Sequence, residues 1–196
     1  MIKAQYAADL QSGVGRNHRH ESAEKHVSGE ARFIDDKPEL PGLLHLCPRL
    51  SEHAHARILH IDVQPCYAVP GVVSVLTWQD VPGINDVGPL EPGDPLLAHN
   101  KVEYLGQIVI AVAAEWPGAA GLGAAAAVIE YEVLEPLLDV EQALAQGSFV
   151  QDPHIHQRGD VDVALARAPH RVSGSFHIGG QEHFYLETQT AMVVPG

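Results

Sequence analysis

The stretch "KVEYLGQIVIAVAAE", residues 101–115, decides the fold of this 196-residue chain. From Ile108 its side chains are valine, isoleucine and alanine without a polar interruption. Such a run is too apolar for a strand with one solvent-facing side, and indicates a strand buried on both faces. We therefore predict a central strand here. Gly106 and Gln107 interrupt its start, which favours a β-bulge or a close backbone approach over ligand contact.

The next segment, "WPGAAGLGAAAA" (116–127), combines an alanine run with Pro117, a residue suited to the first position of a helix. It also contains Gly118, Gly121 and Gly123. Each glycine costs a helix roughly 0.8 to 1 kcal/mol relative to alanine. We therefore predict a helix over 116–127 that depends on packing rather than on intrinsic propensity.

Shorter elements lie on both sides of this pair. The β-prone runs, separated by proline, glycine and acidic turns, are 43–47, 56–63 and 71–77. Residues 80–100 are dense in proline, glycine and aspartate and predict a long surface loop. An alternating strand at 127–134 and a short helix at 138–147 follow, the helix with Asp139 as N-cap and Gly147 as its stop. These elements together predict an α+β fold.

The ends of the chain differ in composition from this middle. Residues 1–25 form a polar arm without a signal-peptide core, and residues 148–170 form a polar linker in which we place a domain boundary. Strand signals resume from Arg171, with Phe184 on the parity expected to pack inward and Glu187 on the other. The short segment 171–196 is too small to close a core of its own, since isolated hairpins are marginal in water.

The net charge of −13 excludes general nucleic-acid binding. No lysine or arginine lies between Lys101 and Arg158, so this acidic region also disfavours anionic membranes, and no apolar run reaches membrane-spanning length. Cys47 and Cys66 form no C-x-x-C pair, which argues against a disulfide framework, a zinc site or an iron–sulfur site in this chain. A reducing, cytoplasmic location is the simplest expectation.

Several clusters invite a chemical interpretation. The pairs His53-Ala-His55 and His154-Ile-His156 lack a third ligand, which favours surface or partly buried histidines over a metal site. The adjacent Asp35 and Asp36 point apart and suit a turn before Pro38 rather than acid–base chemistry. Neither cysteine has a basic helix start or a histidine beside it in the sequence, so we expect structural thiols.

The motif "GGQEHFYLETQ" (179–189) is the strongest candidate site. Gly179 and Gly180 permit close approach to the backbone, and Gln181 offers one acceptor and two donors at the same place. These residues alone leave a plain turn and a ligand contact evenly weighted.

Six blocks in order resemble the molybdenum-binding large subunit of xanthine dehydrogenase, within the xanthine dehydrogenase and aldehyde oxidase family of molybdenum hydroxylases. The blocks are "HVSGEARFIDD" (26–36), "HAHARILHIDV" (53–63), "VPGVVSVLTWQDVPG" (69–83), "YLGQIVIAVAAE" (104–115), "VIEYEVLEPLLDVEQAL" (128–144) and the motif at 179–189. The stretch "DVGPLEPGDPLLA" (86–98) is similar to bacterial two-subunit xanthine dehydrogenases.

This resemblance implies an α/β-hammerhead domain at 26–147, a linker at 148–170 and, at 171–196, the first strands of an incomplete molybdopterin-binding domain. In the family the glutamine corresponding to Gln181 lies beside molybdenum, while Phe184 and Glu187 match motif positions to which we assign structural support. The family hydroxylates hypoxanthine and xanthine with oxygen from water. Electrons leave through 2Fe-2S clusters and FAD to NAD, and the resemblance places these carriers on a small partner subunit in a hetero-oligomer.

The resemblance also implies that much of the active site lies elsewhere. The second glycine-rich molybdopterin loop, the residues that orient substrate and the general-base glutamate have no counterpart in these 196 residues. We therefore expect an N-terminal portion of a large subunit that is inactive alone and pairs with the remainder of that subunit. Two alternatives stay open: a non-catalytic partner-binding or remnant module, and the same fold in an aldehyde oxidase or another heterocycle hydroxylase.

Overall fold

The computed structural model describes residues 15, 17, 19–89, 91–185 and 188–195. They belong to two compact units, which are described separately. One unit runs from Leu40 to Ser173. The other combines residues up to Glu39 with residues from Gly174 onward, so it brings together the stretches that precede and follow the first unit in the sequence.

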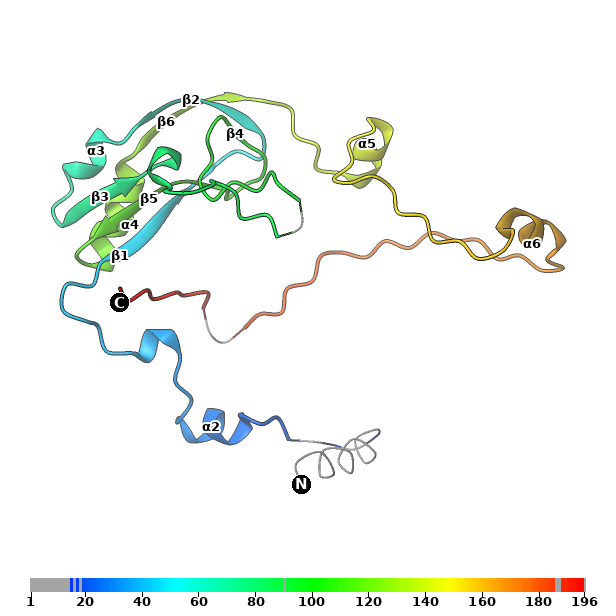
Figure 1. Cartoon of the computed structure of the whole chain (residues 1–196), viewed down its shortest axis with the longest axis horizontal. Helices are drawn as coiled ribbons and strands as arrows, with labels where there is room; N and C mark the ends of the chain where they lie inside the picture. Colours follow the sequence, from blue (N-terminus) through cyan, green and yellow to red (C-terminus); the bar gives the residue numbers. More distant parts are fainter. Residues whose placement is uncertain (1–14, 16, 18, 90, 186–187, 196) are drawn as a thin grey trace. The chain divides into compact units, whose positions relative to one another are not determined.

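The first unit contains two antiparallel three-stranded sheets (Figure 1). One sheet has the order β1 (His45–Leu50), β5 (Ile108–Ala114), β3 (Val72–Leu76). The other has the order β4 (Lys101–Val102), β2 (Ala56–Asp62), β6 (Val128–Val133). The helices are α3 (Gln64–Tyr67), α4 (Pro117–Ala126), α5 (Val140–Ala145) and α6 (Val161–Arg167), with a 3-10 turn η2 at Trp78–Asp80.

The prediction of a central strand is confirmed by β5, which lies between β1 and β3. Six of its seven residues are buried, from Val109 to Ala114. Val112 pairs with Cys47 on one side and with Val75 on the other. The uninterrupted apolar run is explained by this position, because a strand covered on both faces has no side open to water.

Helix α4 covers one face of the β1–β5–β3 sheet (Figure 1). Pro117 occupies its first turn, as predicted, and the helix buries Ala119, Ala120, Gly123 and Ala124. Ala124 belongs to the same buried cluster as Val102 and Ile110, so the helix and both sheets share one core. The dependence of this glycine-rich helix on packing therefore has a visible basis in the small residues that it buries.

Gly106 and Gln107 form a tight turn between β4 and β5. Gly106 has φ of +87°, and its N–H donates to the carbonyl of Ser51 at 2.9 Å. Gln107 is 2% exposed, and its Oε1 accepts from the N–H of Glu103 at 2.8 Å. The structural interpretation of this pair is supported, although a turn takes the place of the expected bulge at these two residues. The pairing of β1 with β5 is irregular nearby, where Arg49 pairs with Ile110 and Leu50 pairs with Ile108.

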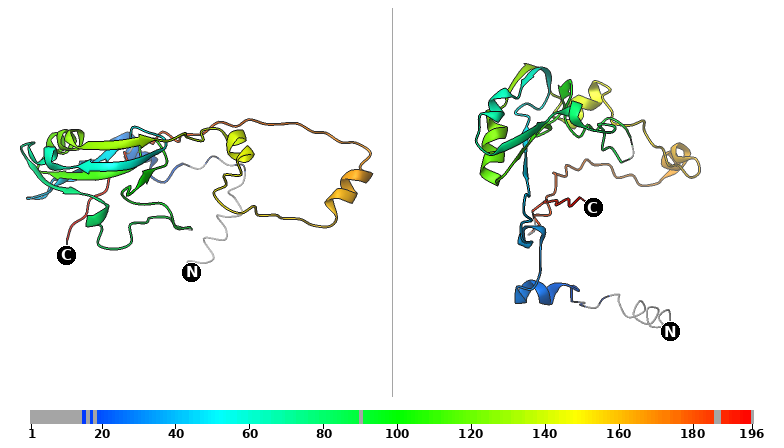
Figure 2. Two further views of the ribbon diagram at one scale, coloured as in Figure 1. Left: turned by 90° about the horizontal axis from the view of Figure 1, so that it is seen from above. Right: turned by 60° about the vertical axis from the view of Figure 1, so that its left-hand side comes forward.

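Residues 134–173 carry the two short helices α5 and α6, which Figure 2 shows on extended chain. Asp139 caps α5, as predicted: its carboxylate accepts from the N–H groups of Glu141 and Gln142. Gly147 has φ of +65°, the left-handed conformation expected just after a helix. Helix α6, capped by Asp160 at 2.9 Å from the N–H of Val163, was not predicted within the polar linker.

In the second unit, α2 (Ala23–Ser28) starts inside the predicted arm, and a 3-10 turn η1 (Ile34–Asp36) confirms the turn expected at Asp35 and Asp36. The expected strands from Arg171 onward are wrong for the described residues, because 171–185 and 188–195 contain no strand. Phe184 is 91% exposed rather than packed inward. A strand needs hydrogen-bonding neighbours, and this short segment has none of its own.

Candidate functional site

Gly179, Gly180 and Gln181 lie in extended, solvent-exposed chain in the second unit. A Cβ atom added to either glycine would meet nothing within 4 Å, and neither glycine has a left-handed φ. The plain turn that we held equally open is therefore not formed. Within the part of the chain that the structure describes, no hydrogen bond engages the Gln181 amide, which leaves its donors and its acceptor available to a bound group.

Among the residues that follow, Phe184 departs from the extended backbone that a strand requires. Phe184 has φ of +54°, and its N–H donates to Oε1 of Glu182 at 3.2 Å. The rings of His183 and Tyr185 stack at 5.8 Å with an interplanar angle of 8°, so both lie on the same side of the Phe184 backbone. The structural support assigned to Glu187 falls outside the described residues.

Thr188, near the end of the motif, and Thr190, just after it, contact a carboxylate that the sequence analysis placed only in a turn. The Thr188 hydroxyl donates to Oδ2 of Asp35 at 2.9 Å, and the Thr190 hydroxyl lies 3.5 Å from the same oxygen. The two hydroxyls are 3.0 Å apart. The spacing of two residues was a weak signal for a shared partner, but nothing in the sequence identified Asp35 as that partner.

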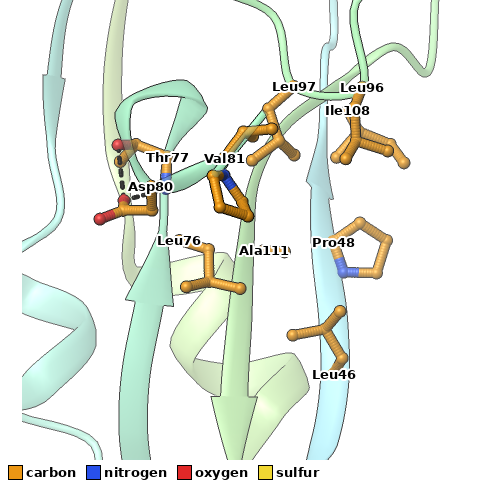
Figure 3. Close-up of a pocket in the computed structure, with 11 residues that line it drawn as sticks. Leu46, Pro48, Leu76, Thr77, Asp80, Val81, Leu96, Leu97, Ile108 and Ala111 are labelled. Carbon is orange, nitrogen blue, oxygen red and sulfur yellow. Dashed lines mark hydrogen bonds between the residues drawn. The ribbon is translucent and has the colours of Figure 1, made fainter. Parts of the chain in front are cut away.

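A separate apolar pocket of about 300 Å³ lies in the first unit (Figure 3). Its floor is the face of the β1–β5–β3 sheet that contains Leu46, Pro48 and Ala111, and its rim comes from residues 77–82, 96 and 97. Cross-strand partners share a face, so this is the face opposite the one on which Val112 meets α4. Sequence reasoning did not predict this pocket.

Asp80 is the ionisable residue that lines this pocket. Its Oδ2 accepts from the backbone N–H of Thr77 at 2.7 Å and from the Thr77 hydroxyl at 2.8 Å, as Figure 3 shows. These two hydrogen bonds, the backbone one first, lower the pKa of the Asp80 carboxyl below its ordinary value. The other side chains that line the pocket are apolar apart from Thr77, so the pocket is suited to apolar contact.

The histidine pairs are occupied by local contacts or lie on exposed chain. Nδ1 of His55 is 2.8 Å from the carbonyl of Glu135, and His53 packs edge-on against Tyr131 at 5.0 Å. His154 and His156 are exposed. The described residues contain no group of three or more His, Cys, Asp or Glu side chains arranged to hold a metal ion.

Both cysteines are free thiols; Cys47 is half-buried and Cys66 is buried in α3. Burial, partly opposed by a backbone hydrogen bond, raises the pKa of the Cys66 thiol and keeps it neutral. Among the described residues, no helix has both the length and the apolar character needed to cross a bilayer.

Comparisons with known protein families identify both parts of the chain. Residues 28–135 match the family model described as "Aldehyde oxidase and xanthine dehydrogenase, a/b hammerhead domain". The chain belongs to this family. Residues 145–196, which include Gln181, match the model described as "Molybdopterin cofactor-binding domain". The hammerhead fold and the start of the cofactor-binding domain are thereby confirmed, whereas the boundaries predicted at 147 and 170 stay predictions.

Curated relatives of the chain include mammalian aldehyde oxidases. It is 41% identical to aldehyde oxidase 4 of Rattus norvegicus over 94% of its length, and 40% identical to aldehyde oxidase 2 of Macaca fascicularis over 95%. In both cases it spans 14% of the relative. These matches support the molybdenum hydroxylase family, and not xanthine dehydrogenase in particular.

Solved structures show the same relationship. The aldehyde oxidoreductase from Desulfovibrio desulfuricans matches with a TM-score of 0.62 and 27% identity over 79% of this chain and 19% of that one. The CO dehydrogenase from Oligotropha carboxidovorans matches with a TM-score of 0.58 and 33% identity over 71% of this chain and 18% of that one. Quinoline 2-oxidoreductase from Pseudomonas putida 86 has a TM-score of 0.56 and 33% identity over 66% and 17%. These three proteins are named for different substrates, so the shared fold does not fix the substrate.

Proposed function

We propose that this chain is the N-terminal portion of the large subunit of a molybdenum hydroxylase, in which Gly179, Gly180 and Gln181 form one wall of the molybdenum cofactor site. The observation that carries the proposal is the free space around both glycines, followed by an exposed amide, inside a segment that matches a molybdopterin cofactor-binding domain. These residues fit the group, because a bulky cofactor needs close backbone approach and hydrogen-bonding atoms at the same place.

The cofactor, when bound, supplies the oxidation chemistry by which a substrate carbon gains oxygen from water. In this proposal, the residues of this chain hold and orient the cofactor. Gln181 can donate two hydrogen bonds and accept one, and the two glycines leave the backbone before it uncovered. One glutamine cannot also place the substrate, so the remaining walls would come from the rest of the subunit, and the isolated chain would be inactive.

Hypoxanthine and xanthine are the substrates we propose first. The support is the resemblance of 86–98 to two-subunit xanthine dehydrogenases. The electron path that accompanies this proposal runs through 2Fe-2S clusters and FAD on a small partner subunit to NAD, in a hetero-oligomer. We propose the reducing cytoplasm as its location, on the two free thiols.

An aldehyde is the second candidate substrate. It is favoured by the 40–41% identity to mammalian aldehyde oxidases over nearly the whole chain. The two candidates share the cofactor, the fold and the role of Gln181, and they differ in residues that orient the substrate, which this chain does not supply.

The test is to purify the complete large subunit with its partner and to measure bound molybdenum and kcat/KM for hypoxanthine, xanthine and an aromatic aldehyde. We expect stoichiometric molybdenum and turnover of a purine. A preference for the aldehyde would replace the first substrate by the second, and a preparation without molybdenum would overturn the proposal.

A matched pair of variants tests the role of the glutamine. Gln181→Ala should lower kcat at least about tenfold, since loss of one positioned hydrogen-bonding group at a reacting centre commonly costs that much or more. Gln151→Ala, at another exposed glutamine, should leave kcat unchanged. Equal activity of the two variants would contradict the assignment of Gln181.

A further inference from the structure

Asp35 is joined to residues that lie 153 and 155 positions later in the chain. The Thr188 hydroxyl donates to Asp35 Oδ2 at 2.9 Å, Thr190 approaches the same oxygen, and the two hydroxyls contact each other at 3.0 Å. Residues two apart on extended backbone share a face, so both threonines present their hydroxyls to one acceptor. We call these three residues the Asp35 latch.

The neighbouring carboxylate has a different task. Asp36 Oδ2 accepts from the N–H of Phe33 at 2.9 Å, and the N–H of Lys37 closes η1 on the carbonyl of Ile34 at 3.1 Å. Asp36 therefore holds the turn together, while Asp35, next to it on the tight turn, reaches the distant threonines. The adjacent acidic pair is divided between a local and a long-range role.

The latch lies within one compact unit, which joins the chain before Leu40 to the chain after Ser173. This unit contains Gly179, Gly180 and Gln181. We propose that Asp35 is a positioning residue for the cofactor wall: it fixes the segment that follows Gln181 to the segment that precedes the hammerhead strands. This inference rests on the function proposed above, because it assigns the purpose of the latch to that site.

The geometry restricts what the latch can do. Thr188 is seven residues from Gln181, and the hydrogen bonds of Asp35 among the described residues go to the two threonines. Its effect would reach Gln181 along the chain between Thr188 and Gln181, whose described part, 182–185, contains no strand. A hydrogen bond to a carboxylate is stronger than one between neutral groups, which suits it to anchoring such a segment.

The first experiment needs no metal. Hydrogen–deuterium exchange of the 196-residue chain is compared for Asp35→Ala, Thr188→Val and the double variant. Each single change should speed exchange of the hydrogen-bonded amides of Asp36 and Lys37 in η1 by about threefold to tenfold, in line with the loss of one exposed hydrogen bond beside that turn. The double variant should exchange no faster than the faster single variant, because both changes break the same contact.

Two matched variants serve as controls. Thr188→Ser keeps the hydroxyl and should exchange like the wild type, and Asp152→Ala removes an exposed carboxylate outside the latch and should do the same. Unchanged exchange in both Asp35→Ala and Thr188→Val, or additive effects in the double variant, would overturn the latch.

The second experiment tests positioning in the complete, molybdenum-loaded enzyme. Asp35→Ala should lower kcat about threefold or more, with KM and molybdenum content near wild type. The same variant should alter the Mo(V) electron paramagnetic resonance signal. Thr188→Val should change kcat and this signal in the same way, whereas Thr188→Ser should keep both near wild type. An unchanged signal and kcat would restrict Asp35 to a structural role and overturn the positioning claim. A wild-type enzyme without molybdenum would overturn the proposed function and, with it, the positioning of a cofactor wall. The exchange experiment would still decide whether the Asp35 latch forms.

Discussion

Gly123 of α4 lies directly against Val112 of β5: a Cβ atom on this glycine would be 2.9 Å from Cγ1 of Val112. The same atom would be 2.8 Å from Cγ2 of Val72 in β3. Real Cβ atoms are not found that close to a neighbour, so the helix approaches the sheet only because this position has no side chain. The glycine that weakens the helix is thus required by the contact that stabilises it.

Gly123→Ala should therefore destabilise the first unit. The gain in helix propensity is about 0.8 to 1 kcal/mol, whereas overpacking of a core commonly costs about 1 to 3 kcal/mol, so we expect a net loss of roughly 1 kcal/mol. Urea unfolding followed by tryptophan fluorescence measures it, because Trp78 and Trp116 both lie in this unit.

Gly121→Ala is the opposite case on the same helix. A Cβ atom at Gly121 would meet nothing within 4 Å, so only the propensity term remains. This variant should gain about 0.5 to 1 kcal/mol in the free energy of unfolding. If Gly123→Ala proved as stabilising as Gly121→Ala, the close packing of α4 on Val112 would be wrong.

Gln107 should be needed for stability rather than for chemistry. Its buried Oε1 satisfies the N–H of Glu103 at 2.8 Å, within the turn that Gly106 permits. Gln107→Leu should lower the free energy of unfolding by about 1 kcal/mol, since the part-buried hydrogen bond from the N–H of Glu103 is lost. Gln151→Leu, on exposed chain, is the control and should change stability by less than about 0.5 kcal/mol. A Gln107→Leu protein as stable as this control would contradict the prediction.

Asp139→Ala should unwind α5 locally without unfolding the sheets. The carboxylate caps two N–H groups, of Glu141 and Gln142, and α5 has no buried residue. Loss of such a cap costs about 1 kcal/mol. We expect faster hydrogen exchange confined to 140–146, with the fluorescence-detected unfolding midpoint unchanged. A shift of that midpoint would show that α5 is coupled to the core.

The elements predicted best are those whose signals are local. The apolar run of β5, the proline that opens α4 and the Asp139 cap each depend on residues within one element. Helix α6 has the same kind of signal in Asp160, but it is only seven residues long and lies inside the polar segment 148–170, whose composition predicts a linker.

Contacts between residues far apart in the sequence could not be predicted from such local signals. The parity of residues around Phe184 predicted which face would be buried, but a strand forms only when a neighbour is present, and Phe184 is 91% exposed. The contact between Asp35 and Thr188 spans 153 residues, and no period or spacing reports it. The free space around Gly179 likewise depends on the fold, whereas its pairing with Gln181 was visible from the motif.

Asp86 should make the loop at 84–98 sensitive to acid. Its carboxylate accepts from the N–H groups of Gly88 at 2.8 Å, Gly93 at 2.6 Å and Asp94 at 3.3 Å. The backbone hydrogen bond from Gly88, followed in importance by that from Gly93, lowers the pKa of this carboxyl below its ordinary value of 3.8. A depressed folded pKa stabilises the loop above the unfolded pKa, and this contribution is lost as pH falls from 3.8 through the lower, folded value.

The expected result is a loss of loop order in acid that depends on this one side chain. The loop can be followed by NMR chemical shifts of 84–98 from about pH 7 to about pH 2.5, a range that begins well above the ordinary value of 3.8 and extends below it. In Asp86→Asn the shifts should differ already at neutral pH and change less in acid. Asp94→Asn is the matched control, because it removes a charge from the same loop while its backbone N–H still donates to Asp86. An acid transition that persists in Asp86→Asn would assign the effect to another group.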